Sequence, residues 1–134
     1  MSDDVRVGIV LVSHSAALAE GAAELAAQIS GGTVAIIPAG GTDDGRLGTS
    51  AAKVARAVKL ADDGAGVVIL PDLGSAVLTV RALLGEPSDL PAPVQLADAP
   101  FVEGAVTATV AAAGGGDIKA VLAAAEGARH ARKL

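Results

Sequence analysis

The sequence contains no cysteine, which excludes disulfide bonds, thiolate nucleophiles and cysteine-ligated metal sites. It also lacks tryptophan and tyrosine and has a single phenylalanine, so a chain that is 51% hydrophobic must build its core from aliphatic residues and alanine. Such a core favours tightly packed helices with small residues at their contacts. Acidic residues outnumber basic ones, and the formal charge of −5 argues against a nucleic-acid partner, because phosphate backbones require clustered lysine and arginine.

Long apolar runs are missing as well. No stretch approaches the roughly 18 residues of a membrane span, because charges, prolines or glycine clusters interrupt every run. The chain begins Met-Ser-Asp-Asp, whereas the first region of a signal peptide is positively charged. We therefore expect a cytoplasmic protein without a membrane partner, and the length fits one domain over residues 1–134.

Apolar segments and helix-patterned segments alternate along the chain. Strands are predicted at 5–12, 34–37, 67–70 and, shorter and peripheral, 94–96. The first helix is predicted from the spacing of Leu18, Ala22, Leu25 and Ile29, with Ser15 as N-cap and a stop at Gly31-Gly32. This alternation predicts an α/β fold, an open and mostly parallel sheet with helices on both faces.

Four further helices complete the pattern. The second has its apolar stripe at Ala51, Val54, Ala55 and Val58, with Thr49 or Ser50 as N-cap. The third begins at Ser75 as N-cap and ends near Gly85, and the proline-rich linker 86–93 that follows cannot be helical throughout. The remaining two are predicted at 102–113 and after Asp117 as N-cap.

Polar residues follow each of the first three predicted strands. They are Ser13-His14-Ser15, Gly40-Gly41-Thr42-Asp43-Asp44 and Asp72-Leu73-Gly74-Ser75. In a parallel sheet all three segments open on the same side. A carboxylate that accepts a hydrogen bond from one imidazole nitrogen leaves the other nitrogen free to attack, and Asp72 is the best candidate to orient His14 in this way. Free N–H groups near Gly74 and Ser75 can bind a phosphoryl group.

Simpler interpretations stay open at this point. Taken singly, His14 can be a hydrogen-bonded residue at an element boundary, Asp72 and Ser75 turn and capping residues, and Gly40-Gly41 a turn. A metal site is poorly supported, because one histidine and scattered carboxylates match no zinc spacing. Arg46, Arg81 and His130 receive no role. The convergence of the three loops is what favours a functional site.

The chain resembles mannose-type enzyme IIA domains of the phosphoenolpyruvate-dependent phosphotransferase system. The resemblance is closest to the branch that serves bacterial dihydroxyacetone kinase. The segments that carry it are Gly8-Ile-Val-Leu-Val-Ser-His14-Ser, Ala19-Glu-Gly21, Gly48-Thr-Ser-Ala-Ala-Lys53-Val, Asp72-Leu-Gly-Ser-Ala-Val77 and Ala99-Pro-Phe-Val-Glu-Gly104-Ala-Val-Thr-Ala-Thr-Val110.

The resemblance implies a phosphotransferase, the phosphoryl-carrier subunit of a phosphoenolpyruvate-dependent dihydroxyacetone kinase. It also implies a four-stranded parallel sheet in each subunit of a homodimer. His14 would accept the phosphoryl group from the histidine-containing phosphocarrier protein and pass it to ADP held in a partner kinase subunit. Asp72 would orient the imidazole, and Ser15, Thr42, Gly74 and Ser75 would bind the phosphoryl group. This chain would bind no cofactor or metal of its own, since ADP and magnesium sit on the partner.

Three other functions remain possible from the sequence. One is a mannose-type enzyme IIA for sugar uptake. Another is a metal-binding or chelatase-like α/β module, although such sites generally need a second histidine and His130 lies in the C-terminal tail. The third is an α/β interaction module in which His14 has no chemistry.

Overall fold

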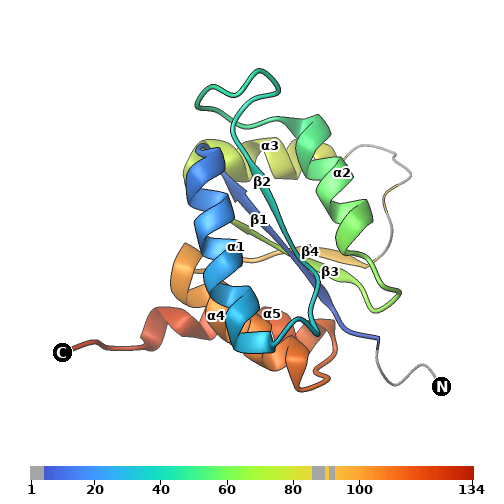
Figure 1. Cartoon of the computed structure of the whole chain (residues 1–134), viewed down its shortest axis with the longest axis vertical. Coiled ribbons are helices and arrows are strands. Elements are labelled where there is room, and N and C mark those ends of the chain that lie inside the picture. The colour runs from blue at the N-terminus through green and yellow to red at the C-terminus, as the bar shows by residue number, and fades with distance from the viewer. Residues whose placement is uncertain (1–4, 86–89, 91–92) are drawn as a thin grey trace.

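A single open sheet forms the centre of the molecule, in a computed structural model that describes residues 5–85, 90 and 93–134 (Figure 1). Its order is β2-β1-β3-β4, and each neighbouring pair is parallel. The strands are β1 (Gly8–Ser13), β2 (Ile36–Gly40), β3 (Val67–Pro71) and β4 (Val94–Leu96). The predicted α/β class and parallel sheet are therefore confirmed.

Helices cover both faces of this sheet. On one face lie α1 (Ala16–Ser30), α4 (Phe101–Ala113) and α5 (Ile118–Gly127), and on the other lie α2 (Ala51–Ala61) and α3 (Gly74–Gly85). A short 3₁₀ helix, η1 (Ala128–His130), follows α5. In the part of the chain that the structure describes, no helix is long and apolar enough to span a bilayer.

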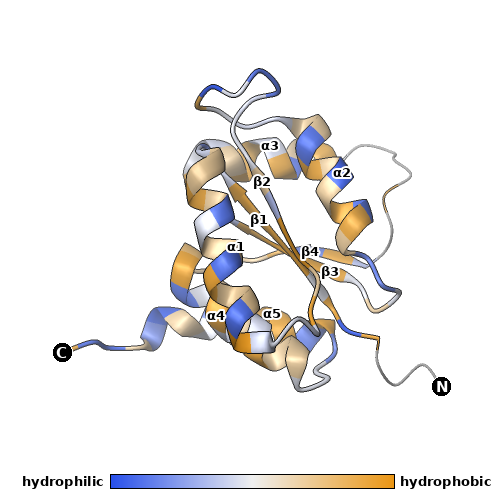
Figure 2. Ribbon diagram, in the orientation of Figure 1, coloured by the Kyte–Doolittle hydropathy of each residue, from blue (hydrophilic) through white to orange (hydrophobic). Residues whose placement is uncertain are grey.

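Side chains of the central strands alternate between two apolar cores. Ile9 and Leu11 of β1 point toward α1, α4 and α5, whereas Val10 and Val12 point toward α2 and α3. Every residue of β1 and β3 is buried, which accounts for their unbroken apolar runs, coloured orange in Figure 2. The prediction of strands covered on both faces is correct for β1 and β3.

The strand bounds differ from the prediction most in β1 (predicted at 5–12) and β2 (predicted at 34–37), whereas β3 ends one residue later than predicted. The first strand starts at Gly8 rather than Val5, because its pairing with β3 begins at Gly8 and Val67 and with β2 at Ile9 and Ile36. The second strand runs to Gly40 and so contains Pro38, where the sequence suggested that a loop begins. Proline is tolerated there because β2 is an edge strand, whose outer side forms no ladder.

The inward face of α1 is also different from the predicted one. Leu18, Leu25 and Ile29 are 45%, 47% and 46% exposed, while the buried face consists of alanines together with Ser30. Small side chains let α1 approach the sheet and α4 closely, in agreement with the small-residue helix contacts that the composition suggests. The spacing of large apolar residues identified the helix but not its buried side.

Most predicted helix caps are confirmed. The side chains of Ser15, Ser50 and Asp117 accept hydrogen bonds from the backbone N–H groups three residues on. Ser75 is the exception, since α3 already begins at Gly74 and places Ser75 inside its first turn. The helix predicted at 102–113 begins one residue earlier, and residues 86–89 and 91–92 of the linker lie outside the described residues.

Gly8 permits the closest contact between the sheet and α2. A Cβ at Gly8 would overlap the carbonyl oxygen of Ala61 and lie 2.9 Å from its Cβ. We expect Gly8→Ala to lower the free energy of unfolding by about 1–3 kcal/mol, because α2 would have to move. Gly21→Ala is the matched control, because Gly21 is an exposed position of α1 where a Cβ would meet nothing within 4 Å. Alanine there should raise the free energy of unfolding by about 0.5–1 kcal/mol. Urea unfolding of both variants measures this, and equal stabilities would contradict the packing argument.

Candidate functional site

The site lies where the direction of the chain through the sheet reverses. From β1 the chain moves to β2 on one side, then crosses to β3 on the other side of β1. The helices that follow β1 and β3 lie on opposite faces, so a crevice opens at the carboxyl ends of these two strands. His14 directly follows β1 and Asp72 directly follows β3, and Val12 and Pro71 are partners in register. The sheet thus brings together two residues that are 58 positions apart.

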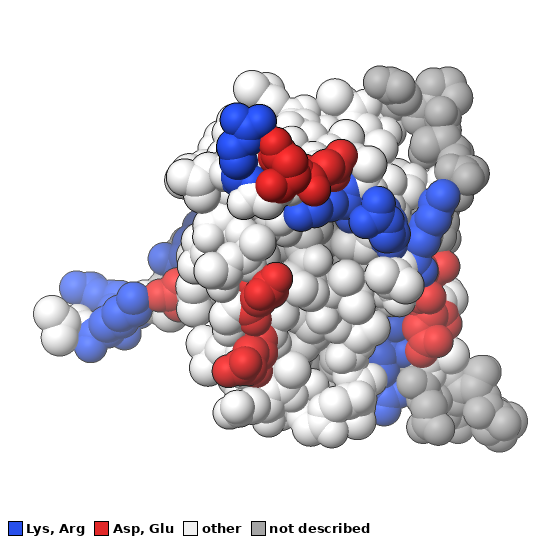
Figure 3. All heavy atoms as spheres, turned by 45° about the horizontal axis from the view of Figure 1, so that its top comes forward, with Lys and Arg blue, Asp and Glu red and all other residues white. Residues whose placement is uncertain are grey.

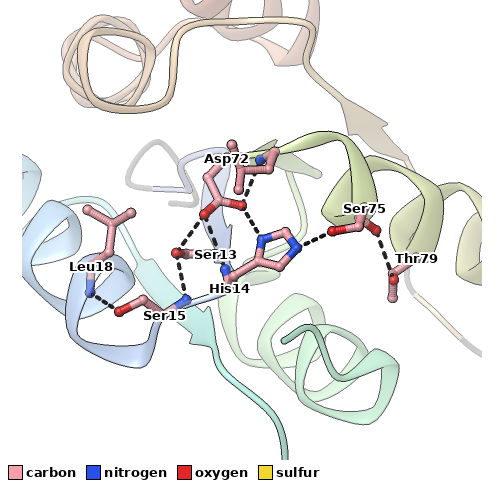
Figure 4. A network of polar contacts seen from close by, with 8 residues as sticks. Ser13, His14, Ser15, Leu18, Asp72, Ser75 and Thr79 are labelled. Atoms are coloured by element: carbon pink, nitrogen blue, oxygen red, sulfur yellow. Dashed lines mark hydrogen bonds and ion pairs between the residues drawn. The ribbon is translucent and has the colours of Figure 1, made fainter. Parts of the chain in front are cut away.

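The imidazole of His14 contacts a residue on each side of the crevice. Its Nδ1 lies 3.0 Å from Oδ1 of Asp72, and its Nε2 contacts Oγ of Ser75 (Figure 4). The side chain of His14 is 22% exposed, so the ring is partly open to solvent. The Asp72 side chain is 9% exposed and lies on the Nδ1 side of the ring.

Four donors surround the Asp72 carboxylate. Oδ1 accepts from the Leu73 N–H at 2.7 Å as well as from His14 Nδ1, and Oδ2 accepts from the Ser13 hydroxyl at 2.8 Å and the His14 N–H at 3.2 Å. Burial raises the pKa of Asp72, but the hydrogen bonds from Ser13, His14 and Leu73 outweigh it and hold the pKa below its usual value. The ionised carboxylate accepts a hydrogen bond from Nδ1–H, so the lone pair of the neutral ring lies on Nε2.

The first turn of α3 supplies further donors beside Nε2. The hydroxyl of Ser75 contacts Nε2, and the helix geometry leaves the N–H groups of Gly74 and Ser75 without carbonyl partners in the helix. A Cβ on Gly74 would meet nothing within 4 Å, so the space around this turn is open. The positive end of a helix together with free N–H groups suits an anion.

The loop that follows β2 is attached to the backbone of the histidine segment. Gly41 N–H donates to the Ser13 carbonyl at 3.1 Å, and Gly48 N–H donates to the His14 carbonyl at 2.9 Å. Thr42 uses its hydroxyl inside the loop, with Asp44 and with the backbone of Arg46. Among the hydrogen bonds of the described residues none joins Thr42 to His14. The loop lies beside His14 as predicted, but the predicted phosphoryl contact of Thr42 has no such geometric support.

Two serines flank His14. Ser15 directly follows His14 in the chain and caps α1 through its Oγ, which accepts from Leu18 N–H at 3.2 Å. Ser13 was not predicted as a site residue, yet it is fully buried and hydrogen-bonded to Asp72. The signal in the sequence is a hydroxyl at the end of an otherwise apolar, fully buried strand, because such a group requires a partner. Figure 4 shows Ser13, Asp72 and His14 as one connected network.

Residues left without a role in the sequence analysis lie around or away from this crevice. Arg81 lines a hollow of about 360 Å³ next to Asp72, and Arg46 pairs with Asp44 on the surface of the loop at 2.7 Å. His130 lies in η1 and lines a different hollow with Asp98 and Glu126. No group of three or more potential metal ligands occurs within residues 5–85, 90 and 93–134.

The fold and site define an open α/β protein in which an aspartate holds a histidine at the switch point of the sheet. The chain belongs to the EIIA-man family, whose model, described as the fructose IIA component of the phosphotransferase system (PTS), matches residues 8–122. A crystal structure of EF1359, described as a protein of unknown function, has 35% sequence identity and a TM-score of 0.79, over 96% of this chain and 97% of that one.

Relatives whose names state a function are also similar to this chain. The phosphoryl donor subunit DhaM of PEP-dependent dihydroxyacetone kinase from Providencia stuartii is 41% identical over 132 residues, which are 95% of this chain. The corresponding subunit of kinase 2 from Listeria innocua is 42% identical over 105 residues, 78% of this chain and 84% of the relative. The chain spans only 28% of the Providencia protein and also 28% of the Escherichia coli one.

Proposed function

We propose that this protein is the phosphoryl-carrier subunit of a PEP-dependent dihydroxyacetone kinase. In this proposal His14 accepts a phosphoryl group from the histidine-containing phosphocarrier protein and passes it to ADP in the partner kinase subunit. The names of relatives that are 41% and 42% identical support the reaction class. The observation that carries the proposal is the 3.0 Å contact between His14 Nδ1 and Asp72 Oδ1, because it makes Nε2 the nucleophile.

The transfer places Asp72 and Nε2 in defined roles. As Nε2 forms a bond to phosphorus, the bond between phosphorus and the donor nitrogen breaks and the electron pair stays on the donor. The His14 ring becomes cationic, and the Asp72 carboxylate, already hydrogen-bonded to Nδ1–H, compensates that charge. In the second transfer a terminal phosphate oxygen of ADP attacks the same phosphorus and the Nε2 lone pair is restored.

The phosphoryl oxygens need donors on the side of the ring that faces away from Asp72. We assign this role to the N–H groups of Gly74 and Ser75 and the hydroxyl of Ser75, which turns from Nε2 to the incoming group. The hydroxyl of Ser15 can contribute because its oxygen accepts in the cap while its proton remains free to donate. Thr42 would take part only if its loop rearranged, since its hydroxyl is engaged there.

The surroundings of His14 suit a protein partner better than a free small molecule. Leu47 and Leu73, in the segments that follow β2 and β3, are 79% and 60% exposed, and Leu18 lies one turn from the cap of α1. Exposed apolar side chains around a reactive group are typical of protein contacts. Figure 3 shows acidic and basic side chains next to one another on one face of the molecule, with uncharged surface around much of it. We propose that the phosphocarrier and the kinase subunit dock here in turn.

The nucleotide and the metal of the second transfer are assigned to the partner. ADP and magnesium belong to the partner kinase subunit, where the metal offsets repulsion between phosphoryl groups, and no cofactor is assigned to this chain. We place the relay in the cytoplasm. The homodimer that the family resemblance implies stays a prediction, which light scattering of the purified protein tests.

The decisive experiment follows the phosphoryl group to its acceptor. Phosphorylated protein is mixed with purified kinase subunits and dihydroxyacetone, with and without the subunit that carries ADP. We expect dihydroxyacetone phosphate only when that subunit is present, and no discharge of His14 by free ADP or free dihydroxyacetone. Efficient transfer to a sugar-transporter IIB domain, and none to the kinase subunit, would instead establish the mannose-type sugar uptake function.

A further inference from the structure

Ser13 is a polar residue in a fully buried position of the site, where an unpaired hydroxyl would be unfavourable. It is the last residue of β1, 0% exposed, in a strand whose other residues are aliphatic or glycine. A buried hydroxyl without partners destabilises the fold, whereas alanine would fit the same space without that cost. The residue is therefore not explained by packing.

Both hydrogen-bonding functions of this hydroxyl are used. Its oxygen accepts from Ser15 N–H at 3.0 Å, and its proton is donated to Asp72 Oδ2 at 2.8 Å. The N–H of Ser15 can only donate, so it determines which side of the Ser13 oxygen accepts and directs the proton toward Asp72. The backbone of Ser13 is also held, because its carbonyl accepts from Gly41 N–H at 3.1 Å. The hydroxyl consequently has one orientation.

We propose that Ser13 is a positioning residue, which locks the Asp72 carboxylate in the rotation that aims Oδ1 at His14 Nδ1 and so keeps the lone pair of the imidazole on Nε2. This inference rests on the proposed phosphoryl transfer at His14. Ser13 does not touch the ring itself in this arrangement. It acts through Oδ2, whose only other donor in the described part of the chain is the His14 N–H, at the longer distance of 3.2 Å.

The physical effect follows from what remains when the hydroxyl is removed. In Ser13→Ala, Oδ2 loses its shorter hydrogen bond, and the carboxylate gains freedom to rotate about the Cβ–Cγ bond. The same hydrogen bond lowers the pKa of Asp72, so its loss makes the carboxylate more basic. The added freedom of rotation weakens the preference for the proton on Nδ1, and a larger fraction of the rings then carries its proton on Nε2, which cannot attack phosphorus.

The test compares Ser13→Ala, Ser13→Thr and the control Ser30→Ala. Ser30 is a second buried serine that bonds to Ala27 and Gly32 at the far end of α1, so its loss reproduces the cost of a missing buried hydroxyl. We expect Ser13→Ala to slow phosphorylation of His14 by the phosphocarrier about 10-fold to 100-fold, as for other groups that orient a histidine. Ser13→Thr, which keeps the hydroxyl, should recover most of the rate, and Ser30→Ala should transfer normally.

Two readouts separate positioning from a general loss of stability. Nitrogen NMR of the His14 ring should show more of the Nε2–H tautomer in Ser13→Ala. The acidic limb of the profile of rate against pH should also move to higher pH, because the pKa of Asp72 rises when the hydrogen bond from Ser13 is lost. Unchanged tautomer and pH profile would overturn the proposal even if the variant were slower. The tautomer measurement needs no partner protein, so it remains decisive if the unmodified protein accepts no phosphoryl group, a result that would reject the proposed function instead.

Discussion

In His14→Ala we expect no phosphoryl label at all after incubation with phosphoenolpyruvate, enzyme I and the phosphocarrier protein. The unaltered protein should carry one acid-labile, base-stable phosphoryl group, because His14 is the histidine at the switch point and its Nε2 faces the first turn of α3. The ring is 22% exposed, so its removal should leave the fold intact, which circular dichroism checks. Radiolabel incorporation followed by gel analysis gives the measurement.

The second histidine provides the control for this experiment. His130 lies in η1 beside Asp98 and Glu126, away from the Asp72 network, and His130→Ala should label like the unaltered protein. Label that persists in His14→Ala, or that disappears in His130→Ala, would move the acceptor and remove the basis of the proposed relay.

Asp72→Asn should reduce the rate of phosphoryl transfer on the order of 100-fold or more, as when control of a histidine tautomer is lost in other enzymes. An amide can turn its NH₂ group toward Nδ1, which then carries the lone pair and leaves the proton on Nε2. It also removes the negative charge that compensates the phosphorylated ring. Rapid-quench measurement of labelling checks this, and Asp98→Asn, which alters an aspartate paired with Arg129, is the matched control. A normal rate in Asp72→Asn would assign Asp72 to structure alone.

The same variant has a predictable dependence of stability on pH. The folded state lowers the pKa of Asp72, so the carboxylate stabilises the fold above its unfolded value of about 3.9 and loses that contribution as the pH falls through the lower folded value. The difference in unfolding free energy between the unaltered protein and Asp72→Asn should therefore be largest near neutral pH and shrink below about pH 4. A difference that grew toward acid pH would contradict the lowered pKa.

Local patterns were sufficient to predict the elements and part of the site. The buried runs of β1 and β3, the caps at Ser15, Ser50 and Asp117, and the glycine stop at Gly31 depend on side chains within a few residues of each other. For the same reason the placement of His14 at a strand-to-helix turn could be predicted. The predictions were wrong for features that depend on contacts with distant segments. These are the start of β1, the end of β2 and the buried side of α1.

Composition and periodicity act locally, so they were enough to predict an aliphatic α/β chain with one histidine at a strand end. Local patterns could not show that β3 lies next to β1, which brings Asp72 to Nδ1 and Ser75 to Nε2 of His14. Nor could they show that the Ser13 hydroxyl faces Asp72, or that alanines rather than leucines form the buried side of α1. These features follow from the order of strands and the distance between packed layers, which depend on contacts between residues far apart in the chain.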